Sequence, residues 1–331
     1  MVYFGEAGFS EWMEHETEPY LKQYDRQGEF MGKDKAAIHY HCYRLPNSEK
    51  CIVISHGFCE FAEKYNEMIY YFLQGGYSVY LAEHRGHGYS ARSVSDTEMV
   101  HVDDYEAYVK DLVLFVKTVV FPHEKEIYLF AHSMGGAIGI LTLEQNPKLF
   151  RAAVLSSPMC GMQTGKFPAW LADLVAAMFC ILGRGRQYAL GQSGFTETPD
   201  FAGSSCVSRE RYDYVFDKRM KYPQYRTYGG SYAWVHAGIR ECRRLMKRKN
   251  LAKIRVPVLL FGAGKEHMVI NDKIRQFAER TEQTTLVWMP EAKHEIFNAD
   301  RESRRKYYET IFTFLKKQGE RDDGGKRYEN D

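Results

Sequence analysis

The sequence has almost no excess of either charge. Its 331 residues include 45 lysines and arginines and 43 aspartates and glutamates, which gives a formal net charge of +2. A chain this close to neutral lacks the positive field typical of nucleic-acid-binding proteins and of proteins drawn strongly to anionic membranes. We therefore expect no nucleic-acid partner, and other partners have to be inferred from individual sites.

Paired cysteines are also lacking. The seven cysteines are scattered without a CxxC pair, a pattern typical of a chain kept reduced, so a zinc site is not expected. His84 and His87 lie in the segment Glu83–Ser90 without a third ligand clustered beside them, and we interpret this segment as a structural turn. The sequence predicts neither a metal nor a cofactor.

Long apolar runs are missing as well. Residues 1–23 mix acidic with apolar residues and have neither the basic start nor the unbroken apolar stretch of a signal peptide. No stretch reaches the roughly 18 uncharged apolar residues of a membrane span. Residues 167–182 come closest and are interrupted by Asp173. We expect a cytoplasmic protein and leave open a transient, peripheral contact with a membrane surface.

Short apolar runs alternate with helical stretches along most of the chain. The runs are rich in apolar and β-branched residues, as strands covered on both faces are: Cys51–Ser55, Ser78–Ala82, Ile127–Ala131, Ala152–Leu155, Val256–Phe261 and Thr285–Met289. Helices are predicted between them, over Glu63–Gln74, Val102–Val119 and Met134–Glu144. Two further strands are expected within residues 27–45, where Ala37–Tyr43 alternates like an antiparallel edge pair. The pattern predicts an α/β fold with a doubly wound, mostly parallel, eight-stranded sheet.

The alternation stops between Pro158 and Asn250, where the sequence becomes aromatic, basic and interrupted by glycine. We interpret residues 158–250 as an inserted, mainly helical cap on a core formed by residues 27–157 and 251–317. Residues 1–26 form an N-terminal extension in this division. Residues 318–331 are almost wholly polar and are predicted to be a disordered tail.

A serine stands where one predicted strand turns into a helix. The strand Ile127–Ala131 runs into His132-Ser133-Met134-Gly135-Gly136, which is the strand-turn-helix context of a nucleophile elbow. The strained turn needs small residues two positions away from the serine, and Ala131 and Gly135 meet this need. The alternative is that Ser133 only caps the helix. The coincidence of strand, turn and Gly-Gly helix start favours the nucleophile.

A nucleophilic serine needs a base and an acid, which follow it in the order acid, base in this fold. His294 comes after the last predicted strand, at the expected start of a final helix, whereas His267 is interpreted as an exposed loop histidine. The acid is expected in the loop 262–272. We favour Glu266 over Asp272, which we expect to cap the helix near Lys273, but both acids stay open.

The oxyanion hole is predicted from the segment that follows the strand Cys51–Ser55. There Gly57 permits a close backbone approach, and the backbone N–H groups of Phe58 and Met134 are the expected donors. His56 is expected to hold this loop by a hydrogen bond.

Together these motifs resemble the bacterial lysophospholipase and monoacylglycerol lipase group of α/β-hydrolases, whose domain is shared with prolyl aminopeptidases. The resemblance covers residues 27–316 and lies in ordered motifs: His56-Gly57-x-x-Glu60, Glu83-His84-Arg85-Gly86-His87-Gly88-x-Ser90, Ala131-His132-Ser133-Met134-Gly135-Gly136-Ala137 and Lys293-His294-Glu295. It implies Ser133 as nucleophile, His294 as base and an acid at Glu266, with the same oxyanion donors. Most relatives carry aspartate where Glu266 and Glu83 stand. Ala131 and the cap segment Gly229–Val235 favour the lysophospholipase side of the group.

The resemblance implies hydrolysis of a carboxylic ester in a lysophospholipid or monoacylglycerol, through an acyl-enzyme. A carboxylesterase for small esters, a prolyl-type aminopeptidase and a non-catalytic binding protein on the same scaffold are the alternatives. The apolar segment 167–182 either lines an acyl-chain site or packs on the core; the candidate substrate contacts are Trp170, Leu174, Met178 and Trp234. Basic cap residues either meet a lipid phosphate or lie in solvent: Arg184, Arg186, Arg209, Arg211, Arg219, Lys221 and Arg226. No oligomeric state is predicted.

Overall fold

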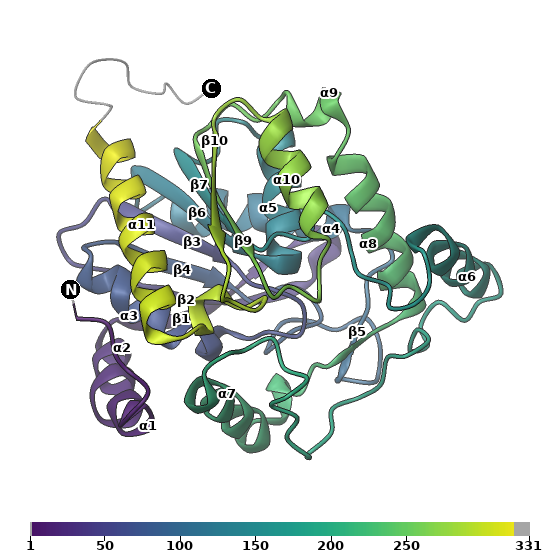
Figure 1. Ribbon diagram of the computed structural model, residues 1–331, viewed down its shortest axis with the longest axis horizontal. Helices are drawn as coiled ribbons and strands as arrows, with labels where there is room; N and C mark the ends of the chain where they lie inside the picture. The colour runs from purple at the N-terminus through teal and green to yellow at the C-terminus, as the bar shows by residue number, and fades with distance from the viewer. Residues whose placement is uncertain (1, 321–331) are drawn as a thin grey trace.

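The structure is a computed structural model and describes residues 2–320. Its centre is an eight-stranded sheet in the order β1-β2-β4-β3-β6-β7-β9-β10 (Figure 1). The strands are β1 (Asp25–Met31), β2 (Ala37–Tyr43), β3 (Lys50–Ser55), β4 (Ser78–Ala82), β6 (Glu126–His132), β7 (Ala152–Ser156), β9 (Val258–Ala263) and β10 (Thr284–Met289). From β4 to β10 neighbouring strands are parallel, and β2 is antiparallel to both β1 and β4. The predicted mostly parallel sheet with an antiparallel edge pair is confirmed.

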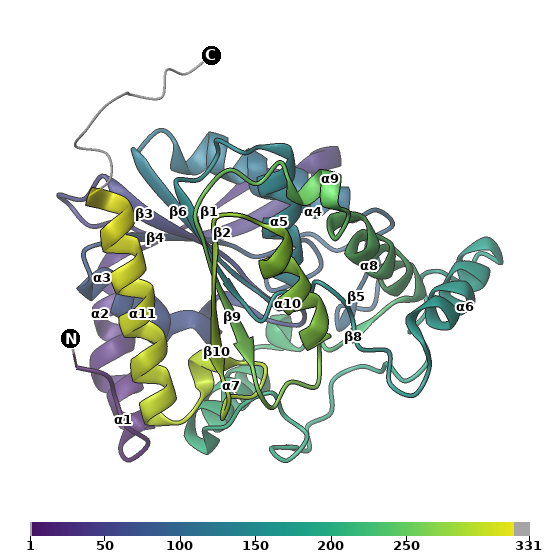
Figure 2. The ribbon, with the colours of Figure 1, turned by 45° about the horizontal axis from the view of Figure 1, so that its top comes forward.

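Helices cover both faces of the sheet (Figure 2). One face carries α3 (Asn66–Gln74) and α11 (Arg301–Glu320), and the other carries α4 (Glu106–Phe115), α5 (Ser133–Gln145), α8 (Tyr232–Leu245) and α10 (Asn271–Arg280). Successive residues of one strand therefore enter opposite cores: Cys51 and Val53 of β3 face the α5 side, and Ile52 and Ile54 face the α3 side. This double burial explains why the strands read as unbroken apolar runs.

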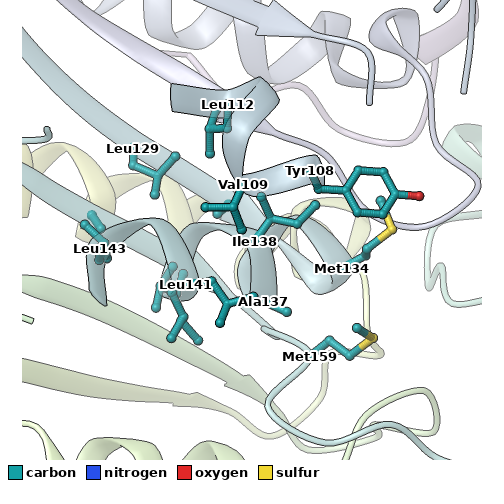
Figure 3. Packing of buried hydrophobic residues seen from close by; sticks show 14 of the residues in the cluster. Tyr108, Val109, Leu112, Leu129, Met134, Ala137, Ile138, Leu141, Leu143 and Met159 are labelled. Carbon is teal, nitrogen blue, oxygen red and sulfur yellow. The ribbon is translucent and has the colours of Figure 1, made fainter. Parts of the chain in front are cut away.

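Helix α5 lies at the heart of the second core. Every residue from Ser133 to Glu144 is buried, since the helix is enclosed by the sheet, α4 and α8. Figure 3 shows Ile138 of α5 beside Val109 of α4, within one continuous apolar cluster. A helix that is apolar on all sides has one stable place, the inside of the protein. The burial of α5 therefore fixes the position of Ser133 at its N-terminus.

The N-terminal residues pack on the core. Two short helices, α1 (Phe9–Trp12) and α2 (Glu18–Tyr24), precede β1, which begins at Asp25, so the predicted boundary after residue 26 falls inside this strand. At the other end, α11 continues to Glu320, so the disorder predicted from Gln318 is wrong for residues 318–320. Residues 321–331 of that predicted tail lie outside the described residues.

The chain between β7 and β9 contains the segment expected to form a cap. It carries α6 (Ala169–Ile181), α7 (Arg209–Lys221), the short strand β8 (Gly229–Gly230), α8 and α9 (Arg248–Leu251). Strand β8 pairs in parallel with β5 (Met99–Val100). Helix α8 belongs to the main core, because Trp234 and Leu245 lie in the same cluster as α5. Helices α6 and α7 lie at the periphery (Figure 1). No helix within residues 2–320 has both the length and the apolar content to cross a membrane.

Candidate active site

Ser133 occupies a strained turn between β6 and α5. Its φ of 52° lies in the left-handed region, where a non-glycine residue is held only by strong surrounding constraints. Gly135 is one such constraint, since a Cβ atom there would lie 2.1 Å from the backbone oxygen of Ser55. The glycine lets the start of α5 approach the end of β3. The predicted elbow is present in the structure.

The alanine at position 131 is accommodated by a second small residue. Ala131 is fully buried at the end of β6, and a Cβ atom at Gly139 of α5 would lie 3.1 Å from the Ala131 Cβ. Gly139 therefore leaves the space that the Ala131 methyl group occupies. This compensating glycine lies six residues beyond the serine, nearly two helical turns along α5, and cannot be read from the elbow motif alone.

Ser133, His294 and Glu266 form one hydrogen-bonded series. The Ser133 Oγ lies 2.8 Å from His294 Nε2, and His294 Nδ1 lies 2.7 Å from Glu266 Oε2. The side chains of His294 and Glu266 are 5% and 1% exposed, so water scarcely competes for these bonds. His294 lies in the loop after β10, followed by a 3-10 helix over Ile296–Asn298, and α11 begins only at Arg301. The expectation that His294 starts the final helix is therefore wrong.

Glu266 is held in place by the backbone of its own loop. Its second oxygen, Oε1, accepts hydrogen bonds from the N–H groups of His267 at 2.9 Å, Met268 at 2.7 Å and Val269 at 3.3 Å. Burial opposes the ionisation of this carboxyl, but the hydrogen bonds from His294 and from the backbone outweigh burial and hold the pKa of Glu266 below its usual value. Glu266 is thus an anion at neutral pH.

Asp272 does not approach His294. Its side chain is 81% exposed and pairs with Arg275 at 3.5 Å. The N-cap of α10 is Ile270, without a side-chain cap, so the expectation that Asp272 caps this helix is wrong. Of the two acids that the sequence left open, the structure brings only Glu266 to the histidine.

The loop after β3 presents the other predicted donor beside the serine. In the described part of the chain the N–H of Phe58 has no protein acceptor, and the N–H of Met134 lies in the first turn of α5, where an intrahelical acceptor is lacking. His56 Nε2 accepts from the His84 N–H at 2.8 Å, which agrees with its predicted structural role. His87 Nε2 accepts from the Cys59 N–H at 3.1 Å. These histidines therefore shape the loop.

A buried ionic network next to the serine was not predicted. Lys64 lies 2.8 Å from Glu60 and 2.7 Å from Glu295, and its side chain is 5% exposed. Burial disfavours the ammonium, but the two carboxylates outweigh burial and raise the pKa of Lys64 to about 12. Burial lowers the pKa of the neighbouring His132 to about 4, so this imidazole is neutral at neutral pH. Glu60 and Lys64 are four residues apart, a spacing that brings opposite charges together in a helix. This spacing was the sequence pattern from which their ion pair could have been predicted.

A cavity of about 390 Å³ contains Ser133 and His294. Most of its lining residues come from the segment 191–206 and from α7. Others come from the loops that carry Phe58, Met268 and Glu295. The cavity is thus large enough for a small organic ligand. Residues 2–320 contain no group of three or more His, Cys, Asp or Glu side chains arranged to hold a metal ion.

The predicted substrate contacts on α6 do not reach this cavity. Trp170, Leu174 and Met178 are 63%, 60% and 49% exposed, and none of them lines it. Their prediction as contacts within the site of Ser133 is therefore corrected. Trp234 is buried and does not line the cavity either, but its ring lies 4.2 Å from that of Phe58, which does. The opposite face of α6 packs on α8, where Asp173 pairs with His236 at 2.7 Å.

The sequence of the chain matches a known family over most of its length. The family model described as "Serine aminopeptidase, S33" matches residues 46–301, a stretch that runs from before β3 to the first residue of α11. The chain belongs to this family. The matched stretch contains the elbow, the Glu266 loop and His294. The resemblance inferred from the motifs is confirmed.

Relatives within the family are similar over most of this chain. It is 28% identical over 301 residues to the "Probable lysophospholipase L2" of Haemophilus influenzae, covering 90% of this chain and 94% of that one. It is 30% identical over 255 residues to the "Lysophospholipase L2" of Escherichia coli K12, covering 76% and 74%. This chain is accordingly a hydrolase of the lysophospholipase and lipase family.

A solved structure shares the fold. The carboxyl esterase from Bacillus coagulans superposes with a TM-score of 0.71 at 18% identity, covering 88% of this chain and 98% of that one. At this identity the likeness concerns the fold, which is that of the α/β-hydrolases.

Proposed function

We propose that the protein hydrolyses a carboxylic ester of a lipid, either a lysophospholipid or a monoacylglycerol, through an acyl-enzyme on Ser133. The observation that carries the proposal is the hydrogen-bonded series from Ser133 through His294 to Glu266, at the wall of a cavity of about 390 Å³. The lysophospholipase names of the relatives support the lipid substrate.

In this mechanism, His294 Nε2 takes the proton of Ser133 as the serine oxygen attacks the ester carbonyl carbon. Glu266 stabilises the imidazolium through Nδ1. The N–H groups of Phe58 and Met134 bind the oxyanion of the tetrahedral intermediate, and each such donor typically contributes about 2.7 to 4 kcal/mol. The intermediate collapses as His294 gives its proton to the leaving alcohol. Water, activated by His294, then hydrolyses the acyl-serine and releases the fatty acid.

The charges in the cavity disfavour an aminopeptidase. Such an enzyme needs an acidic side chain to hold the amino group of its substrate. Glu60 and Glu295 line the cavity but both pair with Lys64, and Asp200 is exposed and accepts a hydrogen bond from the Gly203 N–H. Neither carboxylate beside Lys64 is free to anchor an amine.

A comparison of substrates tests the proposal. We expect a kcat/KM at least about tenfold higher for a lysophospholipid or a long-chain monoacylglycerol than for nitrophenyl acetate, because a buried acyl chain contributes about 0.8 kcal/mol per methylene group. Release of fatty acid and of nitrophenol would be measured side by side, with monoacylglycerols of graded chain length. A preference for acetate or butyrate esters would support the small-ester carboxylesterase instead, and cleavage of prolyl amides the aminopeptidase.

We further propose that the outer face of α6 contacts a lipid surface. On α6, Trp170, Leu174 and Ile181 are 63%, 60% and 85% exposed, and Phe167, two residues before the helix, is 63% exposed. A protein surface rarely exposes so many large apolar side chains in one place. Three exposed cations flank this face, which suits an anionic headgroup layer: Lys166, Arg184 and Arg186.

Vesicle binding tests this contact. Flotation with vesicles of phosphatidylcholine and phosphatidylglycerol is expected to carry the wild-type protein, and replacing Trp170 and Leu174 with serine should weaken binding at least about tenfold. Phe121→Ser is the matched control, because Phe121 is 43% exposed but lies outside α6. Equal flotation of the double variant and the control would contradict a role for α6.

A further inference from the structure

Among the basic residues of the predicted cap, one arginine differs from the others in its partners and its position. Arg209 pairs with Asp213 at 2.7 Å, Arg226 with Glu197 at 3.2 Å, and the buried Arg211 with two carboxylates. Arg184, Arg186 and Lys221 do not line the cavity of Ser133. Arg219, on α7, lines this cavity and pairs with no carboxylate among the described residues.

The guanidinium of Arg219 has unused hydrogen-bond donors. Its Nη2 donates to the carbonyl oxygen of Cys59 at 2.6 Å, while its Nε is buried and has no partner. The guanidinium carbon lies 5.9 Å, 5.8 Å and 6.0 Å from the ring centres of Phe61, Phe195 and Tyr228. Aromatic rings stabilise a cation but accept no strong hydrogen bond, so a buried donor remains that an anion would satisfy.

The other charges of the cavity do not compensate Arg219. Lys64 neutralises much of the charge of Glu60 and Glu295, and Asp200 is exposed to solvent. Arg219 is therefore a cation within reach of a ligand in the same cavity as the serine. Its bond to Cys59, the neighbour of Phe58, also places it beside the loop expected to bind the oxyanion.

We propose that Arg219 binds the phosphate group of the lipid substrate, so that the enzyme prefers an acylglycerol phosphate to the corresponding monoacylglycerol. This inference rests on the proposed ester hydrolysis and adds a specificity-determining residue to it. A guanidinium suits a phosphate because its fixed N–H groups match the phosphate oxygens and its charge is permanent.

Two substrates that differ only in the phosphate test the proposal: 1-oleoylglycerol and 1-oleoylglycerol 3-phosphate, used below their micellar concentrations. The wild type is expected to have the higher kcat/KM for the phosphate. Arg219→Gln should lower kcat/KM for the phosphate at least about tenfold and change it about twofold or less for 1-oleoylglycerol. Arg219→Lys keeps the charge and should retain part of the preference.

Arg226→Gln is the matched control. Arg226 lies 5.8 Å from the same Phe195 ring but does not line the cavity, so both rates should stay near the wild-type values. An equal loss for both substrates in Arg219→Gln would mean that Arg219 only holds the Cys59 carbonyl, and the proposal would be wrong.

Other outcomes are equally decisive. If Arg219→Gln fails to fold, a wild type that hydrolyses both lipids equally well overturns the proposal, and a clear preference for the phosphate that Arg219→Lys retains supports it. Inhibition of 1-oleoylglycerol hydrolysis by inorganic phosphate, without a preference for the phosphate-bearing lipid, would indicate a free-anion site and also overturn it. A wild type inactive on both lipids and on nitrophenyl esters would contradict the proposed hydrolysis itself.

Discussion

Ser133→Ala is expected to lower kcat for any ester substrate by about 10⁴-fold or more while leaving the fold intact. Without the hydroxyl, no acyl-enzyme forms, and only the oxyanion donors and substrate binding assist a direct attack by water. The alanine methyl group fits the space of the serine side chain, because the substitution only removes the hydroxyl oxygen. Initial rates with a nitrophenyl ester would measure the loss in kcat. Circular dichroism of the variant would show whether the fold is intact.

Covalent labelling provides the companion measurement. A fluorophosphonate should label the wild-type protein and fail to label Ser133→Ala. Ser204→Ala is the matched control, because it removes another hydroxyl from the same cavity and should still be labelled. Labelling that persists in Ser133→Ala, or a folded wild type that is never labelled, would contradict a nucleophilic Ser133 and favour the non-catalytic alternative.

The fold could be predicted because its signals are local. Parallel strands with helices on both faces must be apolar at every position, and this is why β3, β4, β6 and β7 stand out. The predicted ends of strands and helices were less accurate where a single residue sets the end. Strand β9 begins at Val258 because Pro257 has no N–H for the ladder. Helix α4 begins at Glu106, whose N–H donates to Asp104, and not at Val102.

The walls of the cavity could not be predicted because they depend on distant pairs. The apolar content of α6 was the most visible feature of the predicted cap, yet the more polar α7 lines the cavity. Helix α7 is held there by Arg211, which bonds to Glu67 at 2.7 Å across 144 residues of sequence. Such pairs leave no periodic pattern. The elbow and the acid loop, in contrast, are each contained in a few consecutive residues.

Glu266→Gln is expected to lower kcat by about 10⁴-fold, the typical cost of imposing the wrong tautomer on the catalytic histidine. The three backbone N–H groups around Oε1 require an oxygen at that position, so the amide oxygen of glutamine would take it. The NH₂ group would then face His294 Nδ1 and donate to it. His294 would carry its proton on Nε2, where it could no longer accept the proton of Ser133. Initial rates at neutral pH would measure the loss.

Asp272→Asn serves as the control for the acid, because it removes the other carboxylate of the same loop region from an exposed position. We expect its kcat to stay within about twofold of the wild type, as is usual for an exposed substitution outside a site. The reverse result, a severe loss in Asp272→Asn and a mild one in Glu266→Gln, would mean that the loop rearranges when substrate binds.

Glu266→Asp separates the effect of the charge from that of the side-chain length: it keeps the anion but shortens the side chain by one methylene group. An activity between those of the wild type and Glu266→Gln would show that the reach of glutamate matters here, where most relatives are expected to carry aspartate.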